Sequence, residues 1–167
     1  MKILVTGGAG FIGSHLSERL INEGHEVIVF DSLLRGNKIS KSTFEKIHFI
    51  KADIRDEKAV LEASKGCDII VHMAAVLGVD IVADTPIETM DVEVIGCRNV
   101  VMAAEQNNVK KIIYASTSGI YGHSVFEKTL SEEVLVDPRS SYAMAKRYNE
   151  IYLCLLYTSP SPRDQAK

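Results

Sequence analysis

The chain has 167 residues, of which 46% are hydrophobic and 25% charged, a composition typical of one globular domain and not of a disordered chain. No stretch approaches the roughly 18 uncharged apolar residues that a membrane-spanning helix needs, and no cleavable signal opens the chain, so we expect a cytoplasmic protein without a membrane partner. The formal net charge of -3, with both signs interspersed, gives no basic face for nucleic acid and favours small-molecule partners.

Five short apolar runs, each followed by a polar stretch long enough for a helix, predict the strands of a parallel sheet. They lie at 2–6, 26–30, 47–51, 68–72 and 111–116, and their nearly continuous hydrophobicity is typical of strands covered by helices on both faces. The helices expected in this part of the chain are 12–22, 56–64, 86–107 and 142–153. We therefore predict an α/β fold, a Rossmann-type doubly wound parallel sheet, with its binding crevice at the carboxyl ends of the strands.

Helical spacing predicts the buried faces of two of these helices. The first would bury Ile12, Leu16, Leu20 and Ile21, and the third Val92, Ile95, Val100, Ala103 and Ala104. The three cysteines, Cys67, Cys97 and Cys154, have neither CxxC nor histidine spacing, so we expect ordinary thiols, without a disulfide framework or a metal site.

A glycine-rich turn, TGGAGFIG at 6–13, follows the first strand and opens the first helix. In that context the backbone N–H groups at the helix N-terminus can face a pyrophosphate. Gly10 would permit close approach of the phosphates, and Gly13 close packing of the helix on the strand. A plain strand-to-helix turn is the alternative.

Asp31 ends the second strand, eighteen positions after Gly13. An acidic residue there accepts hydrogen bonds from the adenosine ribose hydroxyls and so favours NAD over NADP as the cofactor, although Arg35 leaves NADP open. A strand-ending cap is the alternative role for Asp31. Asp53, after the third strand, would accept from the adenine amino group or cap the helix near Asp56.

Six segments in this order, TGGAGFIG, DSLLRGN, ADI, HMAA, YASTSGIYG and YAMAK, resemble the extended short-chain dehydrogenase/reductase family, specifically its NAD-dependent nucleotide-sugar epimerase/dehydratase branch, over residues 1–153. The resemblance implies a nucleotide-sugar substrate. It implies that the pyrophosphate is lined by Gly7, Gly10, Phe11, Ile12 and Gly13, the ribose by Asp31, Ser32, Arg35 and Asn37, the adenine by Asp53 and Ile54, and the central part of the cofactor by Ala74 and Ala75. His72 is expected to be a hydrogen-bonded core histidine.

Tyr142 and Lys146 are four residues apart on a predicted helix, so their side chains share one face. A nearby ammonium favours the phenolate, which makes Tyr142 a general base, and Lys146 would also donate to the nicotinamide ribose. Taken alone, the pair would be a solvated helix face. Thr117 matches the family's catalytic Ser/Thr position, with Ser116 and Ser118 as neighbouring alternatives and strand capping as a structural one.

Two positions depart from the family pattern. Dehydratases and decarboxylases of this branch carry an acidic residue where Gly119 stands, so the resemblance implies 4-epimerisation, in which Tyr142 takes the proton of the 4-hydroxyl and a 4-keto sugar turns over before hydride returns. Glu93 stands where the family usually has Asn, which puts part of the hydrogen-bond network in question. The alternatives are a nucleotide-sugar reductase, dehydrogenase or dehydratase, and a non-catalytic NAD sensor.

The segment from Cys154 to Asp164 corresponds to the translation of DNA that looks like a transposase adapter used for sequencing libraries. We therefore expect residues 1–153 to be an incomplete NAD-binding domain and 154–167 a non-native tail. The fragment would be weakly active or inactive, and the full-length enzyme a homodimer.

Overall fold

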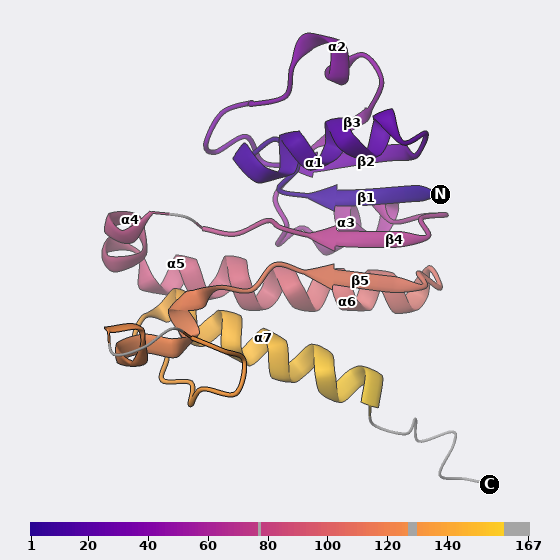
Figure 1. The fold of residues 1–167 in the computed structure, drawn as a ribbon. Coiled ribbons are helices and arrows are strands. Elements are labelled where there is room, and N and C mark those ends of the chain that lie inside the picture. The colour runs from indigo at the N-terminus through magenta and orange to yellow at the C-terminus, as the bar shows by residue number, and fades with distance from the viewer. Residues whose placement is uncertain (77, 127–129, 159–167) are drawn as a thin grey trace, which may run out of the picture.

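The computed structural model describes residues 1–76, 78–126 and 130–158, which build one parallel five-stranded sheet in the order β3-β2-β1-β4-β5 (Figure 1). The strands are β1 (Lys2–Thr6), β2 (Glu26–Asp31), β3 (His48–Lys51), β4 (Ile69–His72) and β5 (Lys111–Tyr114). All four pairings are parallel. After β3 the chain crosses back to the other side of β1, where β4 and β5 follow, so the switch point of the sheet lies between β1 and β4. The predicted doubly wound, Rossmann-type sheet is confirmed, with strand ends within two residues of the predicted ones.

The helices cover the sheet unequally. Helix α1 packs on one face over β1 and β2, whereas α3 and α6 pack on the other face (Figure 1). The helical elements are α1 (Phe11–Asn22), α2 (Lys41–Phe44), α3 (Glu57–Ala63), α4 (Val79–Asp84), α5 (Pro86–Met90), the π-helix η1 (Asp91–Ile95), α6 (Gly96–Gln106), the 3₁₀ segment η2 (Ser118–Phe126) and α7 (Ser141–Thr158).

The predicted helix 86–107 is present, but its middle is irregular. Elements α5, η1 and α6 follow one another without a break, and the turn Asp91–Ile95 is a π-helix. A π-turn is wider than an α-helical turn because one residue is inserted, and such turns occur often at functional sites. This turn carries Glu93.

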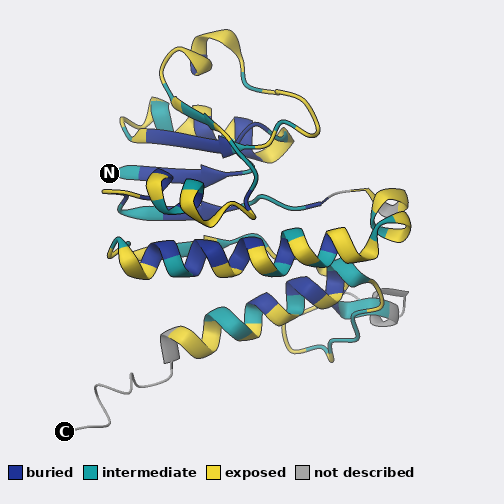
Figure 2. Ribbon diagram, turned by 180° about the vertical axis from the view of Figure 1, so that it is seen from behind, coloured by how far each residue is buried: buried dark blue, intermediate teal, exposed yellow. Residues whose placement is uncertain are grey.

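Two hydrophobic layers form the core, one on each side of the sheet (Figure 2). Leu4, Phe30 and Ile70 pack against α3 and α6, and alternate residues of the same strands pack against α1, as the strand period of two requires. Two predicted core residues were wrong: Ile12 is 65% exposed and Ile95 40% exposed. Ile12 lies in the first turn of α1, ahead of the part that reaches the sheet, and the π-turn rotates Ile95 away from the core.

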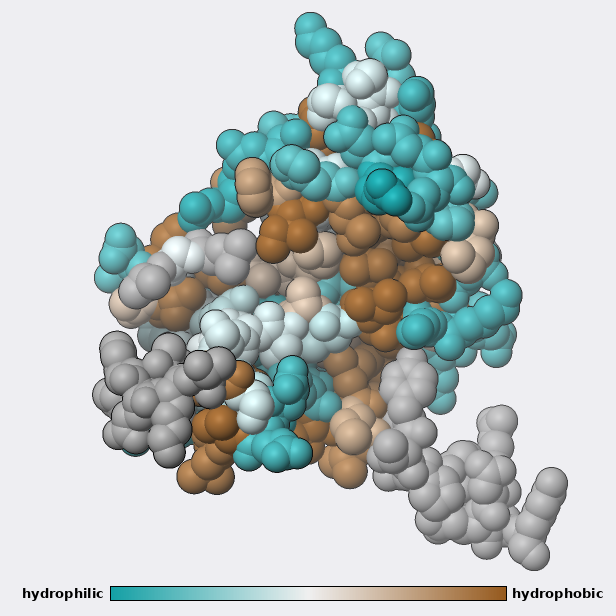
Figure 3. All heavy atoms as spheres, viewed as in Figure 1, coloured by the Kyte–Doolittle hydropathy of each residue, from teal (hydrophilic) through white to brown (hydrophobic). Residues whose placement is uncertain are grey.

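The α1 side of the sheet is partly open at β5. Hydrophobic residues gather across the middle of this face in Figure 3, and Ile113 on β5 is 45% exposed. Among the described residues, no helix combines the length and hydrophobicity required to cross a membrane.

Helix α7 begins where the predicted helix does and runs further. The Ser140 hydroxyl accepts from Ala143 N (3.1 Å) and caps its first turn. The helix continues to Thr158, so the predicted end at 153 was wrong by five residues, and the boundary between the predicted domain and tail falls within this helix. Residues 159–167 of that tail lie outside the described part of the chain.

Candidate active site

The turn between β1 and α1, residues 6–13, is closely packed; we call it the glycine turn. Gly7 has φ +69° and lies against the backbone of Ala74, because a Cβ on Gly7 would come within 2.7 Å of Ala74 N. A Cβ on Gly13 would overlap the Gly7 carbonyl oxygen. The turn and the helix therefore approach as closely as only glycine permits.

The N-terminus of α1 offers hydrogen-bond donors to the crevice. Gly10 is its N-cap and has no side-chain cap, and the first turn carries no acidic residue. Gly10 N donates to Gly7 O, and Ser14 N is the N–H that binds the carbonyl of the N-cap Gly10, so the preceding N–H groups of Phe11, Ile12 and Gly13 have no acceptor within the helix. The exposed side chains of Phe11 and Ile12 do not cover these donors. This uncapped helix end fits a dinucleotide pyrophosphate.

Asp31 connects the glycine turn to the loop after β2. Its carboxylate accepts from Ala9 N (3.0 Å) through Oδ2 and from Leu33 N (2.8 Å) through Oδ1. Leu33 has φ +61°, an uncommon conformation for a branched residue, so this loop is held in a specific shape. Each oxygen keeps a lone pair for a ribose hydroxyl.

The rest of this loop borders the same crevice. Ser32 accepts from Leu34 N and Asn37 from Ile39 N, so both side chains stabilise local turns. Lys38 N donates to Ala9 O, which ties the loop to the glycine turn. A Cβ on Gly78 would lie 3.4 Å from the Arg35 guanidinium, so Arg35 reaches across the crevice to the segment after β4.

Asp53 forms an ion pair at the surface, whereas Ile54 is buried in the core. Arg55 binds the Asp53 carboxylate through Nε (3.0 Å) and Nη2 (2.6 Å), and this pairing lowers the pKa of Asp53. The helix cap considered for Asp53 is supplied by Asp56 itself, which accepts from Ala59 N. Ile54 is 5% exposed and packs in the core against Gly96, so its side chain does not face the crevice.

His72 is a buried, hydrogen-bonded histidine, as predicted. Its Nδ1 lies 2.7 Å from Thr6 Oγ1, and Thr6 Oγ1 also accepts from the N–H groups of Met73 and Ala74. These bonds join the end of β1 to the segment after β4 and place Ala74 against the glycine turn, with Ala75 half-buried beside it. Burial, together with the charge of Lys146, lowers the pKa of His72 to about 3.

Tyr142 and Lys146 lie one turn apart on α7, as predicted, and Thr117 joins them from the segment after β5. Lys146 Nζ is 5.4 Å from the centre of the Tyr142 ring, and the Thr117 hydroxyl is close enough to Tyr142 to lower the pKa of its phenol. Thr117 Oγ1 also accepts from Gly119 N (3.1 Å), which leaves its own proton to donate. Ser116 instead bonds with Glu150, so it is turned away from this group.

The pKa of Tyr142 differs from the sequence-based expectation. The pKa is raised to about 12, chiefly by burial and then by the negative charge of Glu93, while the neighbouring Thr117 hydroxyl acts to lower it. Lys146 does not produce the expected decrease, because its ammonium is held by Glu93 Oε2 (3.1 Å) and the Ala115 carbonyl (2.9 Å).

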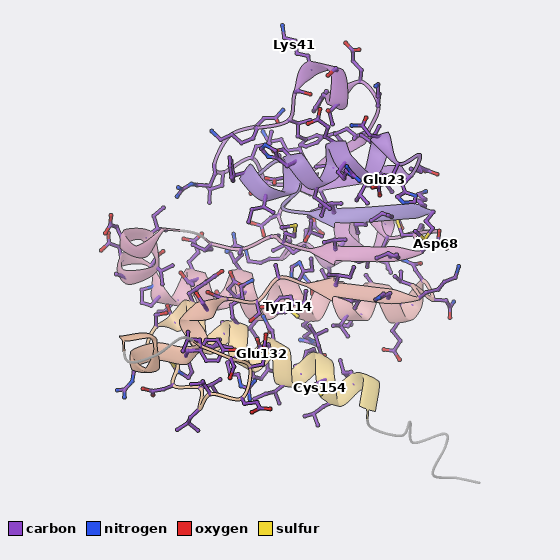
Figure 4. The ribbon with its side chains drawn as sticks, in the orientation of Figure 1. Glu23, Lys41, Asp68, Tyr114, Glu132 and Cys154 are labelled. Carbon is purple, nitrogen blue, oxygen red and sulfur yellow. The ribbon has the colours of Figure 1, made fainter. Side chains whose placement is uncertain are left out.

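Sequence reasoning missed the hydrogen-bonding partners beneath this group. Asn149, fully buried on α7, donates through Nδ2 to Glu93 O and to the Tyr114 hydroxyl, both at 3.0 Å. Figure 4 labels Tyr114 near the end of β5, beside α7. The spacing of Tyr142, Lys146 and Asn149 on one helix is a signal that Asn149 is buried with them, but its partners come from distant segments.

A cleft of about 530 Å³ opens beside Tyr142. Its lining combines apolar residues from the segments around α4 and α5 with polar residues at the start of α7: Val76, Gly78, Val82, Ala83, Pro86, Arg139, Ser140, Ser141 and Tyr142. Such a wall of apolar residues with a few polar groups is typical of a small-molecule site.

Comparison with known proteins gives consistent results. The chain is 39% identical to the UDP-glucose 4-epimerase of Mycolicibacterium smegmatis over 92% of this chain and 50% of that protein. It is 37% identical to the UDP-N-acetyl-alpha-D-glucosaminuronate decarboxylase of Bacillus cytotoxicus over 93% of this chain and 50% of that one. Among solved structures, the Thermus thermophilus UDP-glucose 4-epimerase in complex with NAD matches with a TM-score of 0.85 and 35% identity, over 95% of this chain and 51% of that chain.

The chain thus spans about half the length of the curated relatives that it matches. The model of the NAD dependent epimerase/dehydratase family matches residues 3–157. The chain belongs to this family, whose cofactor is NAD.

Proposed function

We propose that the chain is the NAD-binding part of a nucleotide-sugar epimerase that inverts C4 of the sugar through a 4-keto intermediate. The observation that carries this proposal is the meeting of Thr117, Tyr142 and Lys146 beside the 530 Å³ cleft, with glycine at position 119. Epimerisation needs only removal and return of hydride at one carbon, together with transfer of the hydroxyl proton.

NAD, when bound, accepts and returns the hydride. The uncapped end of α1 would hold its pyrophosphate, and Asp31 its adenosine ribose. Tyr142 would take the proton of the sugar 4-hydroxyl, and the Thr117 hydroxyl would donate to the oxygen as the ketone forms. Lys146, whose ammonium lies 5.4 Å from the centre of the Tyr142 ring, would donate to the nicotinamide ribose.

Position 119 distinguishes epimerisation from elimination. A Cβ on Gly119 would meet Thr117 Oγ1 at 3.4 Å and the Ala143 methyl at 3.6 Å, which are ordinary van der Waals contacts. Packing therefore leaves room for a side chain, yet no acid stands there to serve as a base for eliminating water. This favours epimerisation over the dehydratase alternative.

The nucleotide sugar would occupy the cleft beside Tyr142. Arg139, whose guanidinium pairs with Asp137 (2.8 Å), lies there beside the hydroxyl groups of Ser140 and Ser141, and such donors suit a diphosphate and a sugar. The Mycolicibacterium smegmatis and Bacillus cytotoxicus relatives are named for UDP-linked sugars, and we extend that class to the whole protein. We also propose that the complete enzyme is a cytoplasmic homodimer, which size-exclusion chromatography with light scattering would test for its assembly state.

Incubating the full-length protein with UDP-glucose and NAD tests the activity. Formation of UDP-galactose without net NADH supports an epimerase. Stoichiometric accumulation of NADH indicates a dehydrogenase instead, and loss of water or carbon dioxide from the sugar by mass spectrometry indicates a dehydratase or a decarboxylase. Binding of NAD without any change in the sugar indicates a sensor.

The proposed boundary at 153 has its own test. Native coding sequence that continues beyond Leu153 in other reads of the same source DNA would support a non-native segment 154–167. A gene that ends at Lys167 in several independent reads would contradict it. The chain as it stands is expected to turn over substrate weakly or not at all, and robust turnover would contradict that expectation.

A further inference from the structure

Glu93 is a buried carboxylate placed between two segments of the site. Its side chain is 1% exposed, as is that of Lys146. Oε1 accepts from Val76 N (3.0 Å) in the segment after β4, and Oε2 lies 3.1 Å from Lys146 Nζ on α7. The carboxylate therefore connects the floor of the cleft to the catalytic helix.

The backbone around Glu93 is fixed as well. Glu93 lies in the π-turn η1, and its carbonyl accepts from Asn149 Nδ2 (3.0 Å) on α7. A wide π-turn leaves carbonyl groups that need partners other than those of a regular helix, and Asn149 supplies one. The Glu93 carboxylate is thus held in place from α7 through its own backbone and through Lys146.

Lys146 is held from several sides in the same way. Nζ donates to the Ala115 carbonyl (2.9 Å), and it lies 4.7 Å from the centre of the Tyr114 ring and 5.4 Å from that of Tyr142. Its charge is balanced by Glu93 within the same buried group. The Tyr142 ring therefore lies beside an ion pair and not beside a lone ammonium.

The stability of the fold does not explain why Glu93 and Lys146 form a buried ion pair. Removing two charges from water costs several kcal/mol for each ion, and well-packed apolar residues of similar volume are often as stable or more so. A second role is needed for a carboxylate at this position.

We propose that Glu93 is a positioning residue that holds the Lys146 ammonium against the Ala115 carbonyl and offsets its charge, so that the ammonium does not favour the Tyr142 phenolate in the ligand-free protein. The inference rests on the proposed function only for the acid–base role of Tyr142. It agrees with the raised pKa of that phenol, for which burial is the larger cause and Glu93 the second.

The titratable groups that surround the ion pair come from every element packed on it. Burial raises the pKa of Glu93, and Lys146 opposes this increase. Besides Lys146 and Tyr142 on α7, they are His72 on β4, Cys97 on α6 and Tyr114 on β5.

An NMR titration of the 167-residue chain, labelled with ¹³C at the tyrosine Cζ, tests the proposal without substrate or cofactor. Tyr142→Phe assigns the Tyr142 resonance in each background, and far-UV circular dichroism monitors folding. Glu93→Gln removes the charge at constant size, Glu93→Asp keeps it, and Glu105→Gln is the control at an exposed position further along the same continuous helix.

We expect Glu93→Gln to lower the Tyr142 midpoint by at least about 1 pH unit. Glu93→Asp should stay closer to the unsubstituted protein than to Glu93→Gln, and Glu105→Gln should leave the midpoint unchanged. A folded Glu93→Gln protein with an unchanged midpoint overturns the proposal, as does equal behaviour of the Gln and Asp variants.

Should Glu93→Gln fail to fold, Glu93→Asn is titrated in its place and read in the same way, since its shorter amide leaves Lys146 the bond to Ala115. A midpoint at or below about 10 in the unsubstituted protein, the value of free tyrosine, overturns the proposal whatever the variants show. A full-length protein that fails to epimerise but shows the shift would refute the proposed function and leave the role of Glu93 standing.

Discussion

The two ends of the crevice are built from different parts of the polypeptide. The glycine turn uses main-chain groups from eight consecutive residues, 6–13, and works because side chains are absent. The group around Tyr142 uses side chains from η1, the segment after β5 and α7, and works because the charges of its buried members, Glu93 and Lys146, balance. The first end is therefore sensitive to added volume, and the second to lost charge.

The largest expected effect is at the charged end. Lys146→Met leaves the Glu93 carboxylate buried without its ionic partner, which should reduce the free energy of unfolding by about 3–5 kcal/mol. Urea denaturation measures the loss. Lys65→Met is the control, because it breaks the exposed ion pair with Glu62 and should cost no more than about 0.5 kcal/mol. Similar losses in the two variants would contradict the difference between buried and exposed pairs.

In the glycine turn, adding one methyl group should be enough to lower both the stability and the NAD affinity. Gly13→Ala places a Cβ against the Gly7 carbonyl, and overpacking of this kind typically costs about 1–3 kcal/mol. Isothermal titration calorimetry should show a corresponding loss of NAD affinity, as the turn shifts. Gly24→Ala is the control: Gly24 has positive φ but nothing within 4 Å of an added Cβ, so this substitution should reduce stability without affecting NAD affinity. Unchanged NAD affinity in Gly13→Ala would argue against the turn as the pyrophosphate site.

Asp31 combines a charged side chain with main-chain binding, since its carboxylate accepts from N–H groups of the glycine turn and of the loop after β2. Asp31→Asn should weaken NAD binding by about 1.5–3 kcal/mol, the usual contribution of a hydrogen bond to a charged group. It should weaken NADP binding less, because the negative charge opposes a 2′-phosphate. Calorimetry with both cofactors gives the ratio of the NAD to the NADP dissociation constant in each protein. A ratio that Asp31→Asn leaves unchanged would exclude Asp31 from the ribose site.

His72 lies between the two ends, bonded to Thr6 beside the turn and influenced by Lys146. Its folded pKa of about 3 lies below the unfolded value of about 6.5, so only the unfolded chain binds this proton in between. Its contribution to stability is complete above pH 6.5 and is lost as the pH falls toward 3. At pH 5.5 the loss should be about 1.4 kcal/mol.

Urea denaturation at pH 7.5 and pH 5.5 measures this dependence. His72→Asn, which keeps a hydrogen-bonding group beside Thr6, should remove that part of the pH dependence, whereas the exposed His15→Asn should retain it. Equal pH dependence in His72→Asn and the unsubstituted protein would show that His72 does not contribute.

The difference between the two ends also explains which predictions from sequence succeeded. The glycine turn is local: strand, glycines, helix and Asp31 occur in order within thirty-one residues, so their arrangement follows from the sequence. The same holds for the parallel sheet, because strand and helix periods are local signals. Ile12 and Ile95 failed because helical spacing shows which residues share a face and not where along the helix that face meets the sheet.

The sequence by itself determined the order of the strands and helices along the chain, the glycine turn and the spacing of Tyr142 and Lys146, since each depends on residues close together in the chain. Only the tertiary structure decided that Glu93 reaches Lys146, that Asn149 reaches the π-turn, and that Thr117 and not Ser116 meets Tyr142. Charge balance in a buried site depends on which distant side chains are brought into contact. For that reason the pKa of Tyr142 moves in the direction opposite to the one that its neighbour on the helix predicts.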